Sequence, residues 1–254
     1  MHSETEALFS LRKVSKVFSG GTRVLGGIDL DIYAGECLLL AGSNGSGKTV
    51  LIRILTGLLE PSEGEVLFHG QPLNRITGEL RRSVGLVFQD ADAQFIGETA
   101  EEDVAFGPAN LGFPKGEIPE RVTAALEAVG LQDRRTVHPR RLSGGEKRRL
   151  ATAGILAMGC DTVILDEPFA NLDWPGVIQT LEIIRYLKEG GKTVIILTHE
   201  LEKVLAFADR LVILHRGSIR DDGRPEAVIE RLKPEYGVRD PRGRCDTVGD
   251  CTWL

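Results

Sequence analysis

The sequence predicts an α/β fold with a mostly parallel sheet, an antiparallel β-subdomain and an inserted helical subdomain. Residues 162–165 and 193–197 are short, apolar, β-branched runs separated by a helical stretch, as expected for parallel strands buried on both faces. Residues 28–32 alternate apolar and acidic side chains, which favours a half-buried antiparallel strand. Between residues 99 and 129 strand character is lost and apolar residues recur at helical spacing, so this stretch forms the predicted insertion.

Length and charge limit the classes of function. The chain has 254 residues and a formal net charge of −6, which fits one compact unit without an overall basic field for nucleic acid. Its first residues are acidic where a secretory signal would be basic, and no run of about 18 uncharged apolar residues occurs. We therefore expect a soluble, cytosolic protein whose main partner is not DNA or RNA.

The other elements follow in order along the chain. Strands are predicted over residues 9–17 and 24–32, joined by a turn at 19–21, and over 37–41, 61–70 and 84–88, the last being a core strand. Helices are predicted over residues 50–55, 146–158, 177–187 and 227–232, with a hairpin of residues 211–214 and 217–220 before the last helix. Gly112, Pro114 and Gly116 divide the insertion into pieces, and no internal repeat is present.

These elements predict one domain over residues 1–232, with the helical subdomain inserted at about 90–158, and a polar, flexible tail over 233–254. Cys37 and Cys160 lie in or beside apolar segments and are expected to be small core residues. Cys245 and Cys251 lie in the tail, where a metal or redox pair is the alternative to an unstructured segment. We assign no role to either cysteine of the tail.

A glycine-rich loop of the P-loop type lies between the apolar run 37–41 and the predicted helix. Its residues are Gly42, Ser43, Asn44, Gly45, Ser46, Gly47, Lys48 and Thr49. Glycines let backbone N–H groups converge on phosphates at the start of a helix, while the lysine reaches the β- and γ-phosphates and the threonine hydroxyl binds Mg²⁺. The alternative is an ordinary strand-to-helix turn. Because strand, loop and helix occur in the required order, we predict nucleotide binding.

Polar side chains follow three predicted strands where each strand ends. Asp166 and Glu167 follow residues 162–165, Gln89 follows 84–88, and His199 follows 193–197 by one residue. The carboxyl ends of parallel strands form the ligand-binding edge of such sheets. Asp166 is therefore expected to hold Mg²⁺, and Glu167 to activate the attacking water. The alternatives are a solvated acidic strand end, a structural histidine and a turn glutamine.

Two further features bear on the nucleotide. Ser143, Gly144 and Gly145 precede the helix predicted from Glu146, so their N–H groups and hydroxyl form a second anion site at a helix N-terminus. One nucleotide does not easily satisfy this site and the P-loop in a single chain, which predicts a dimer; a plain helix N-cap is the alternative. Phe18 precedes the first turn and either stacks on the adenine ring or is a core residue.

With these residues in place, the chain resembles the ATP-binding subunits of ABC transporters over residues 8–232. Residues 42–49 resemble Walker A, Gln89 the Q-loop, 142–146 the signature, 163–167 Walker B, 171–173 the D-loop, and His199 the switch histidine. The resemblance implies a P-loop NTPase core of the ABC ATPase type. It also implies that two subunits sandwich two ATP molecules, each between the Walker A of one and the signature of the other.

The resemblance implies the roles of the site residues. The catalytic residues are Lys48, Gln89, Glu167 and His199. The magnesium ligands are Thr49, Gln89 and Asp166. The nucleotide contacts are Phe18, Gly42, Ser43, Asn44, Gly45, Ser46, Gly47, Lys48, Thr49, Val50, Gln89, Ser143, Gly144, Gly145, Glu146, Asp173 and His199. Glu146 replaces the commoner glutamine and Phe169 a usual threonine, and neither departure removes a phosphate contact on which the prediction depends.

A narrower resemblance is to the energy-coupling-factor and cobalt/nickel importer ATPases, and it rests on residues 88–95, 101–112 and 151–158. In that group the segment after the Q-loop takes a helix of the membrane subunit. This implies a docking face with Phe95, Ile96 and Phe106 beside the acidic residues 101–103, although each aromatic could equally belong to the core of the helical subdomain.

We therefore expect an ATPase, using ATP and Mg²⁺, that powers a membrane importer for cobalt, nickel or a vitamin. Its expected partners are a second ATPase subunit, identical or related, a transmembrane coupling subunit and a substrate-capture subunit, at the cytoplasmic face of the membrane. One alternative is a non-transport ABC ATPase acting on nucleic acid or ribosomes, but the chain has neither heptad arrays nor a second P-loop. A small-molecule P-loop kinase is the other, and the signature and His199 argue against it.

Overall fold

The computed structural model describes residues 6–90, 94–243, 247–250 and 252–253, and it contains two sheets. The larger has the strand order β10-β9-β3-β8-β7-β6, in which β10 is antiparallel to β9 and the other pairs are parallel. These strands are β3 (Cys37–Ala41), β6 (Val84–Val87), β7 (Thr162–Asp166), β8 (Thr193–Thr198), β9 (Arg210–His215) and β10 (Ser218–Gly223). The predicted mostly parallel sheet is confirmed.

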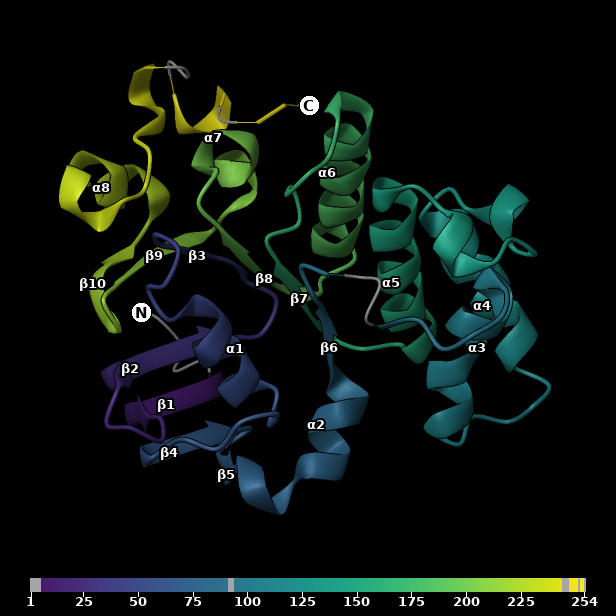
Figure 1. Cartoon of the computed structure of the whole chain (residues 1–254), viewed down its shortest axis with the longest axis horizontal. Coiled ribbons are helices and arrows are strands. Elements are labelled where there is room, and N and C mark those ends of the chain that lie inside the picture. The colour runs from purple at the N-terminus through teal and green to yellow at the C-terminus, as the bar shows by residue number, and fades with distance from the viewer. Residues whose placement is uncertain (1–5, 91–93, 244–246, 251, 254) are drawn as a thin grey trace.

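The smaller sheet is antiparallel and has the order β2-β1-β4-β5. Its strands are β1 (Ala7–Val17), β2 (Arg23–Tyr33), β4 (Glu63–Phe68) and β5 (Gln71–Pro72). In Figure 1 this sheet lies beneath the larger one, with helix α1 (Lys48–Leu55) between them. The predicted antiparallel β-subdomain is therefore confirmed.

Apolar cores cover both faces of the larger sheet, as the continuous apolar strands predicted. Along β3, Leu38 and Leu40 belong to the core shared with α1 and the antiparallel sheet. Cys37 and Leu39 belong to the opposite core, which includes residues of the helices that follow β6 in the chain. Burial raises the pKa of the Cys37 thiol to about 12 and that of Cys160 to about 11, so both behave as the core residues that were predicted.

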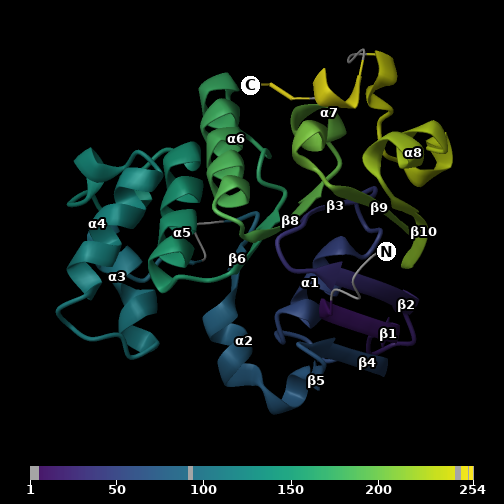
Figure 2. The same cartoon turned by 180° about the vertical axis from the view of Figure 1, so that it is seen from behind.

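Three helices form the inserted subdomain at one end of the molecule (Figure 2): α3 (Ala100–Asn110), α4 (Ile118–Ala128) and α5 (Gly144–Met158). Helix α3 begins with a capping box in which the Thr99 hydroxyl accepts from the Glu102 N–H group and the Glu102 carboxylate accepts from that of Thr99. The helices α3 and α5 approach closely at Gly107, where an added Cβ would lie 2.6 Å from Met158 Cγ. The predicted helical insertion is confirmed.

Several elements differ from the sequence-based expectation. Helices α2 (Thr77–Ser83) and α7 (Leu201–Val204) were not predicted, since both are short. The helix predicted over 177–187 is longer, α6 (Trp174–Glu189), because Asp173 caps it at the N-terminus. The last predicted helix begins earlier, as α8 (Pro225–Glu230) with proline in its first turn. No helix in the described part of the chain is long and apolar enough to cross a membrane.

The described residues after α8 pack onto the larger sheet and its helices. Tyr236 and Val238 are buried in the core, and Val248 and Trp253 pack against it. Their apolar side chains explain this packing, and the domain boundary predicted at residue 232 does not separate them from the core. Cys245 and Cys251 lie outside the described residues, so the prediction of a flexible tail with no assigned cysteine chemistry stays a prediction.

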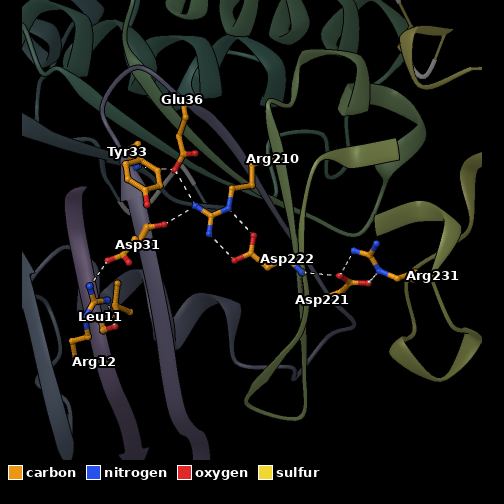
Figure 3. A network of polar contacts seen from close by, with 9 residues as sticks. All are labelled: Leu11, Arg12, Asp31, Tyr33, Glu36, Arg210, Asp221, Asp222 and Arg231. Atoms are coloured by element: carbon orange, nitrogen blue, oxygen red, sulfur yellow. Dashed lines mark hydrogen bonds and ion pairs between the residues drawn. The ribbon is translucent and has the colours of Figure 1, made fainter. Parts of the chain in front are cut away.

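A network of polar contacts joins the two sheets near the start of β3, at the end of this strand opposite the P-loop (Figure 3). Arg210 of β9 donates to the Asp31 carbonyl oxygen at 2.7 Å and to both carboxylate oxygens of Asp222 at 2.6 Å. These bonds hold the pKa of Arg210 above its usual value. Burial raises the pKa of nearby Glu36, and Asp221 pairs at 2.7 Å with Arg231, the residue directly after α8. The network fixes the antiparallel sheet against the edge of the parallel one.

Candidate functional site

The P-loop lies between β3 and α1 and forms the floor of a cavity of about 180 Å³. Its glycines meet two different demands. Gly45 and Gly47 have φ angles of +79° and +107°, which glycine adopts without strain. Gly42 lies so close to neighbouring backbone that an added Cβ would be 2.2 Å from the Leu214 carbonyl oxygen. The cavity is lined by Val24, residues 43–50, Gln89 and Glu167.

Lys48 points from the start of α1 into this site. Its side chain is buried, and Nζ donates to the Gly42 carbonyl oxygen at 2.6 Å and lies 3.5 Å from Glu167 Oε1. The P-loop thus presents its positive charge beside the predicted catalytic carboxylate. A phosphate in the cavity would meet the lysine and the N-terminus of α1 together.

Asp166 lies at the end of β7, next to the P-loop threonine. The Thr49 hydroxyl donates to Asp166 Oδ2 at 3.4 Å, while Oδ1 is buried without a hydrogen-bond partner among the described residues. Burial and then the charge of Glu167 raise the pKa of Asp166. A cation beside it would remove this penalty, so the donor set fits Mg²⁺. The Ser46 hydroxyl is also buried, and no residue that the structure describes forms a hydrogen bond with it, as expected in a binding site for a polar ligand.

Glu167 follows Asp166 with a left-handed backbone conformation, at a φ angle of +48°. Its N–H group donates to the Leu197 carbonyl oxygen of β8 at 2.9 Å, which holds the residue at the sheet edge. Glu167 Oε2 lies 3.0 Å from His199 Nδ1, and Oε1 faces Lys48. The structure therefore brings together the catalytic residues predicted from separate strand ends.

The signature residues form a second site at the N-terminus of α5. Ser143 caps the helix, because its hydroxyl accepts from the Glu146 N–H group at 3.3 Å while the Glu146 carboxylate accepts from the Ser143 N–H group at 2.8 Å. This backbone bond is the main cause of the lowered pKa of Glu146. The hydroxyl of Ser143 and the N–H groups of Gly144 and Gly145 remain as donors for an anion.

Asp173 lies with the signature and not with the P-loop of its own chain. It is the N-cap of α6, where its carboxylate accepts from the Gly176 N–H group at 3.0 Å. Among the described residues, the cavity of about 450 Å³ that Asp173 and residues 143–146 line shares no residue with the P-loop cavity. The predicted nucleotide contacts thus divide between two surfaces of the chain.

Phe18 is placed outside both cavities. It is 40% exposed, which is not the burial of a core residue. Its N–H group donates to the Thr22 carbonyl oxygen across the turn at 3.0 Å, and Lys16 Nζ lies 5.5 Å from its ring centre. The core interpretation of Phe18 is wrong for this reason, and its stacking on adenine stays a prediction.

Arg148 connects the P-loop site to the signature site. Nothing in the sequence distinguished it from the neighbouring Lys147 and Arg149. Its buried guanidinium donates to three carbonyl oxygens, those of Pro168 at 3.0 Å, Ala170 at 2.9 Å and Gln89 at 3.1 Å. Burial lowers the pKa of Arg148. The signature helix is therefore tied to the Q-loop and to the segment after Glu167.

Replacing Arg148 by methionine should lower the free energy of unfolding by about 2–4 kcal/mol, because buried carbonyl groups lose charge-assisted hydrogen bonds. Urea unfolding followed by circular dichroism measures this loss. Arg140→Met is the matched control, since Arg140 is exposed near the start of the same helix. Equal midpoints for both variants would contradict the structural role of Arg148.

Comparisons with known proteins agree with this geometry. The model of the ABC transporter family matches residues 25–170. A putative ABC transporter ATP-binding protein of Halobacterium salinarum is 47% identical over 222 residues, which are 87% of this chain and 95% of the relative. An energy-coupling factor transporter ATP-binding protein, EcfA, of Methanocaldococcus jannaschii is 43% identical over 230 residues, covering 89% of this chain and 82% of that protein.

Two solved structures share the fold over nearly their whole length. The structure of cbiO1 from Clostridium perfringens, described as part of the ABC transporter complex cbiONQ, has a TM-score of 0.81 at 34% identity, covering 96% of this chain and 98% of that one. A dimeric ATP-binding cassette bound to ADP and Pi in a post-hydrolysis state has a TM-score of 0.78 at 27% identity, covering 85% and 98%. Family model, relatives and structures agree, and the chain belongs to the ABC transporter family, as one of its ATPases.

Proposed function

We propose that this ATPase powers an energy-coupling importer for cobalt, nickel or a vitamin from the cytoplasmic face of the membrane. One observation carries the proposal. Glu167 lies 3.5 Å from Lys48 and 3.0 Å from His199, in a chain whose relatives include EcfA proteins and cbiO1. The cargo class rests on these relatives and on the resemblance of residues 88–112 to that group.

Within the site, Glu167 is the general base and His199 holds its carboxylate through Nδ1. Lys48 neutralises the phosphates, and Thr49, Asp166 and Gln89 are the residues that would hold Mg²⁺. Bound there, Mg²⁺ would neutralise negative charge on the phosphates. Lys48 and His199 hold the carboxylate of Glu167 in place, so no second protein base is needed beside it.

A second ATPase subunit, identical or related, completes each site. Ser143 and Asp173 line a cavity apart from the P-loop of their own chain, so the hydroxyl and N–H donors of the signature become useful when another chain brings its nucleotide to them. The affinity of this closed pair for ATP over ADP is what moves the membrane subunit, since a ligand shifts an equilibrium only through such a difference.

The docking face for the membrane subunit is formed by Ile96 and Phe106, which are 66% and 43% exposed. Phe95, in contrast, is partly buried against the core. The acidic residues nearby shape this face: Asp103 Oδ1 accepts from the N–H groups of Ile96 at 2.7 Å and Gly97 at 3.0 Å. The segment that presents Ile96 is therefore fixed to α3, and an apolar helix of a membrane subunit would cover both side chains.

The double substitution Ile96→Asp and Phe106→Asp should abolish co-purification of the tagged chain with its integral membrane subunit from detergent-solubilised membranes. ATP hydrolysis by the isolated chain should be retained, because neither side chain lines the nucleotide cavities. Tyr186→Asp is the control, since Tyr186 is an equally exposed aromatic on α6. Uptake of cobalt, nickel and vitamins by cells that carry each variant then identifies the cargo. Undiminished co-purification of the double variant would contradict the docking face.

A further inference from the structure

The C-terminal residues return to the nucleotide site. We call the described residues 234–238, 247–250 and 252–253 the C-terminal strap. Both views show the yellow C-terminal ribbon passing over α7 and ending near α6 (Figures 1 and 2). Helix α7 follows the switch histidine and α6 follows the D-loop. The strap therefore lies beside the helices that follow the switch histidine and the D-loop.

The first contact of the strap is with the P-loop. Gly237 has a φ angle of +66°, and an added Cβ would lie 2.7 Å from Ser43 Cβ. The preceding Tyr236 is buried, and its ring centre lies 5.8 Å from that of His215 at the end of β9. No side chain fits between the strap and the P-loop at this point, so a shift of either one is transmitted to the other.

The last contact is with the D-loop helix. The ring of Trp253 stacks on that of Trp174 with centres 4.9 Å apart and an angle of 27° between the planes. Trp174 is the first residue of α6, directly after Asp173. Stacked aromatic pairs are stabilised beyond the area that they bury. The stack thus favours one position of the D-loop.

Lys203 of α7 joins this stack to the catalytic strand end. Its Nζ lies 4.7 Å from the ring centre of Trp253 and 5.7 Å from that of Phe169, two residues after Glu167. The same Nζ pairs with Glu200 at 2.5 Å, next to the switch histidine. Because the lysine side chain is 8% exposed, the two rings and the carboxylate must compensate its charge.

We propose that the C-terminal strap is a positioning element for ATP hydrolysis, with Trp253 and Lys203 as its positioning residues. It holds the D-loop and the switch segment at one end through Trp253 and the P-loop at the other through Gly237. The proposal rests on the proposed roles of Glu167, His199 and Asp173, but not on the cargo. Phe169, which replaces a threonine usual in the family, becomes the surface on which Lys203 lies.

The two ends of the strap should give different kinetic defects. Trp253→Ala should lower kcat for ATP hydrolysis by about 10- to 100-fold, because small misplacements of catalytic groups have effects of this size. Its KM for ATP should stay near that of the parent chain, since the P-loop is untouched. Gly237→Ala should instead raise KM by pushing on Ser43. Trp253→Phe should recover most of kcat by restoring the stack.

Arg242→Ala is the matched control, since Arg242 is an exposed residue of the same tail that pairs with Asp240. Tryptophan emission gives a readout apart from activity: the chain has two tryptophans, and they stack on each other. ATP added to the Glu167→Gln chain should change this emission. The change should persist when Trp253→Phe is added, because a ring still stacks on Trp174, and it should shrink when Trp253→Ala removes the stack.

An unchanged kcat in Trp253→Ala, in a preparation where Glu167→Gln is inactive, overturns the strap and leaves the proposed catalytic roles intact. An equal fall of kcat in Arg242→Ala also overturns it, because that residue does not contact the catalytic loops. Full hydrolysis by Glu167→Gln would instead remove the catalytic assignment itself. If Trp253→Ala is unfolded by circular dichroism, the emission of the Glu167→Gln chain with Trp253→Phe decides: a change on addition of ATP supports the strap, and no change overturns it.

Discussion

Glu167→Gln should abolish turnover while the chain still binds ATP. Glutamine has the size of glutamate but does not accept a proton from water, and general bases contribute about 10²–10⁴ in rate. The substitution also removes a negative charge 3.5 Å from Lys48 Nζ. More of the lysine's charge is then available to the phosphates, so ATP affinity should be kept or raised.

Phosphate release measures the first effect and equilibrium titration with ATP the second. Glu226→Gln is a suitable control, because Glu226 is an exposed carboxylate in the first turn of α8. His199→Ala should show a smaller loss of rate than Glu167→Gln, since the histidine orients the carboxylate through Nδ1 and does not replace it. Hydrolysis by Glu167→Gln at the parent rate would show that another group activates the water.

Ser143→Arg should leave ATP binding by the single chain unchanged and stop hydrolysis by the assembled enzyme. Ser143 lines the signature cavity, which shares no described residue with the P-loop cavity. A large side chain there blocks the approach of the other chain's phosphates, and it also removes the hydroxyl that accepts from Glu146 at 3.3 Å. Ser143→Thr keeps that hydroxyl and is the control.

A mixing experiment tests the interchain role directly. In a dimer of one Glu167→Gln chain and one Ser143→Arg chain, one of the two sites combines an intact Glu167 with an intact signature. Mixing the two inactive chains should therefore restore part of the activity if the enzyme is a homodimer. No recovery points to a related but different partner chain. Parent-level hydrolysis by Ser143→Arg alone would contradict the interchain site.

The parts of the candidate site that could be predicted from the sequence depend on local chemistry. Lys48 and Thr49 were identifiable because phosphate binding needs a lysine and a hydroxyl at a fixed distance from glycines. Glu167 and His199 were identifiable because both follow apolar runs, and parallel strands bring their ends together. The structure places Glu167 at 3.0 Å from His199 and at 3.5 Å from Lys48.

The features that were missed depend on contacts between distant parts of the chain. Arg148 lies in a run of basic residues, and only its three carbonyl partners distinguish it from a solvated side chain. The tail looks polar because Asp240, Arg242 and their neighbours outnumber its apolar residues. A single aromatic such as Trp253 does not change that composition, although its position decides where the tail lies.

The left-handed backbone of Glu167 lowers the stability of the chain at the residue that its turnover requires. A glutamate with a φ angle of +48° carries a conformational cost of about 1–3 kcal/mol, and its carboxylate is buried beside that of Asp166. Glycine would relax this conformation and remove the like charge. Selection for a heat-resistant chain would therefore favour losing the residue that makes the chain an enzyme, so thermostabilised variants of this ATPase have to be chosen with position 167 held fixed.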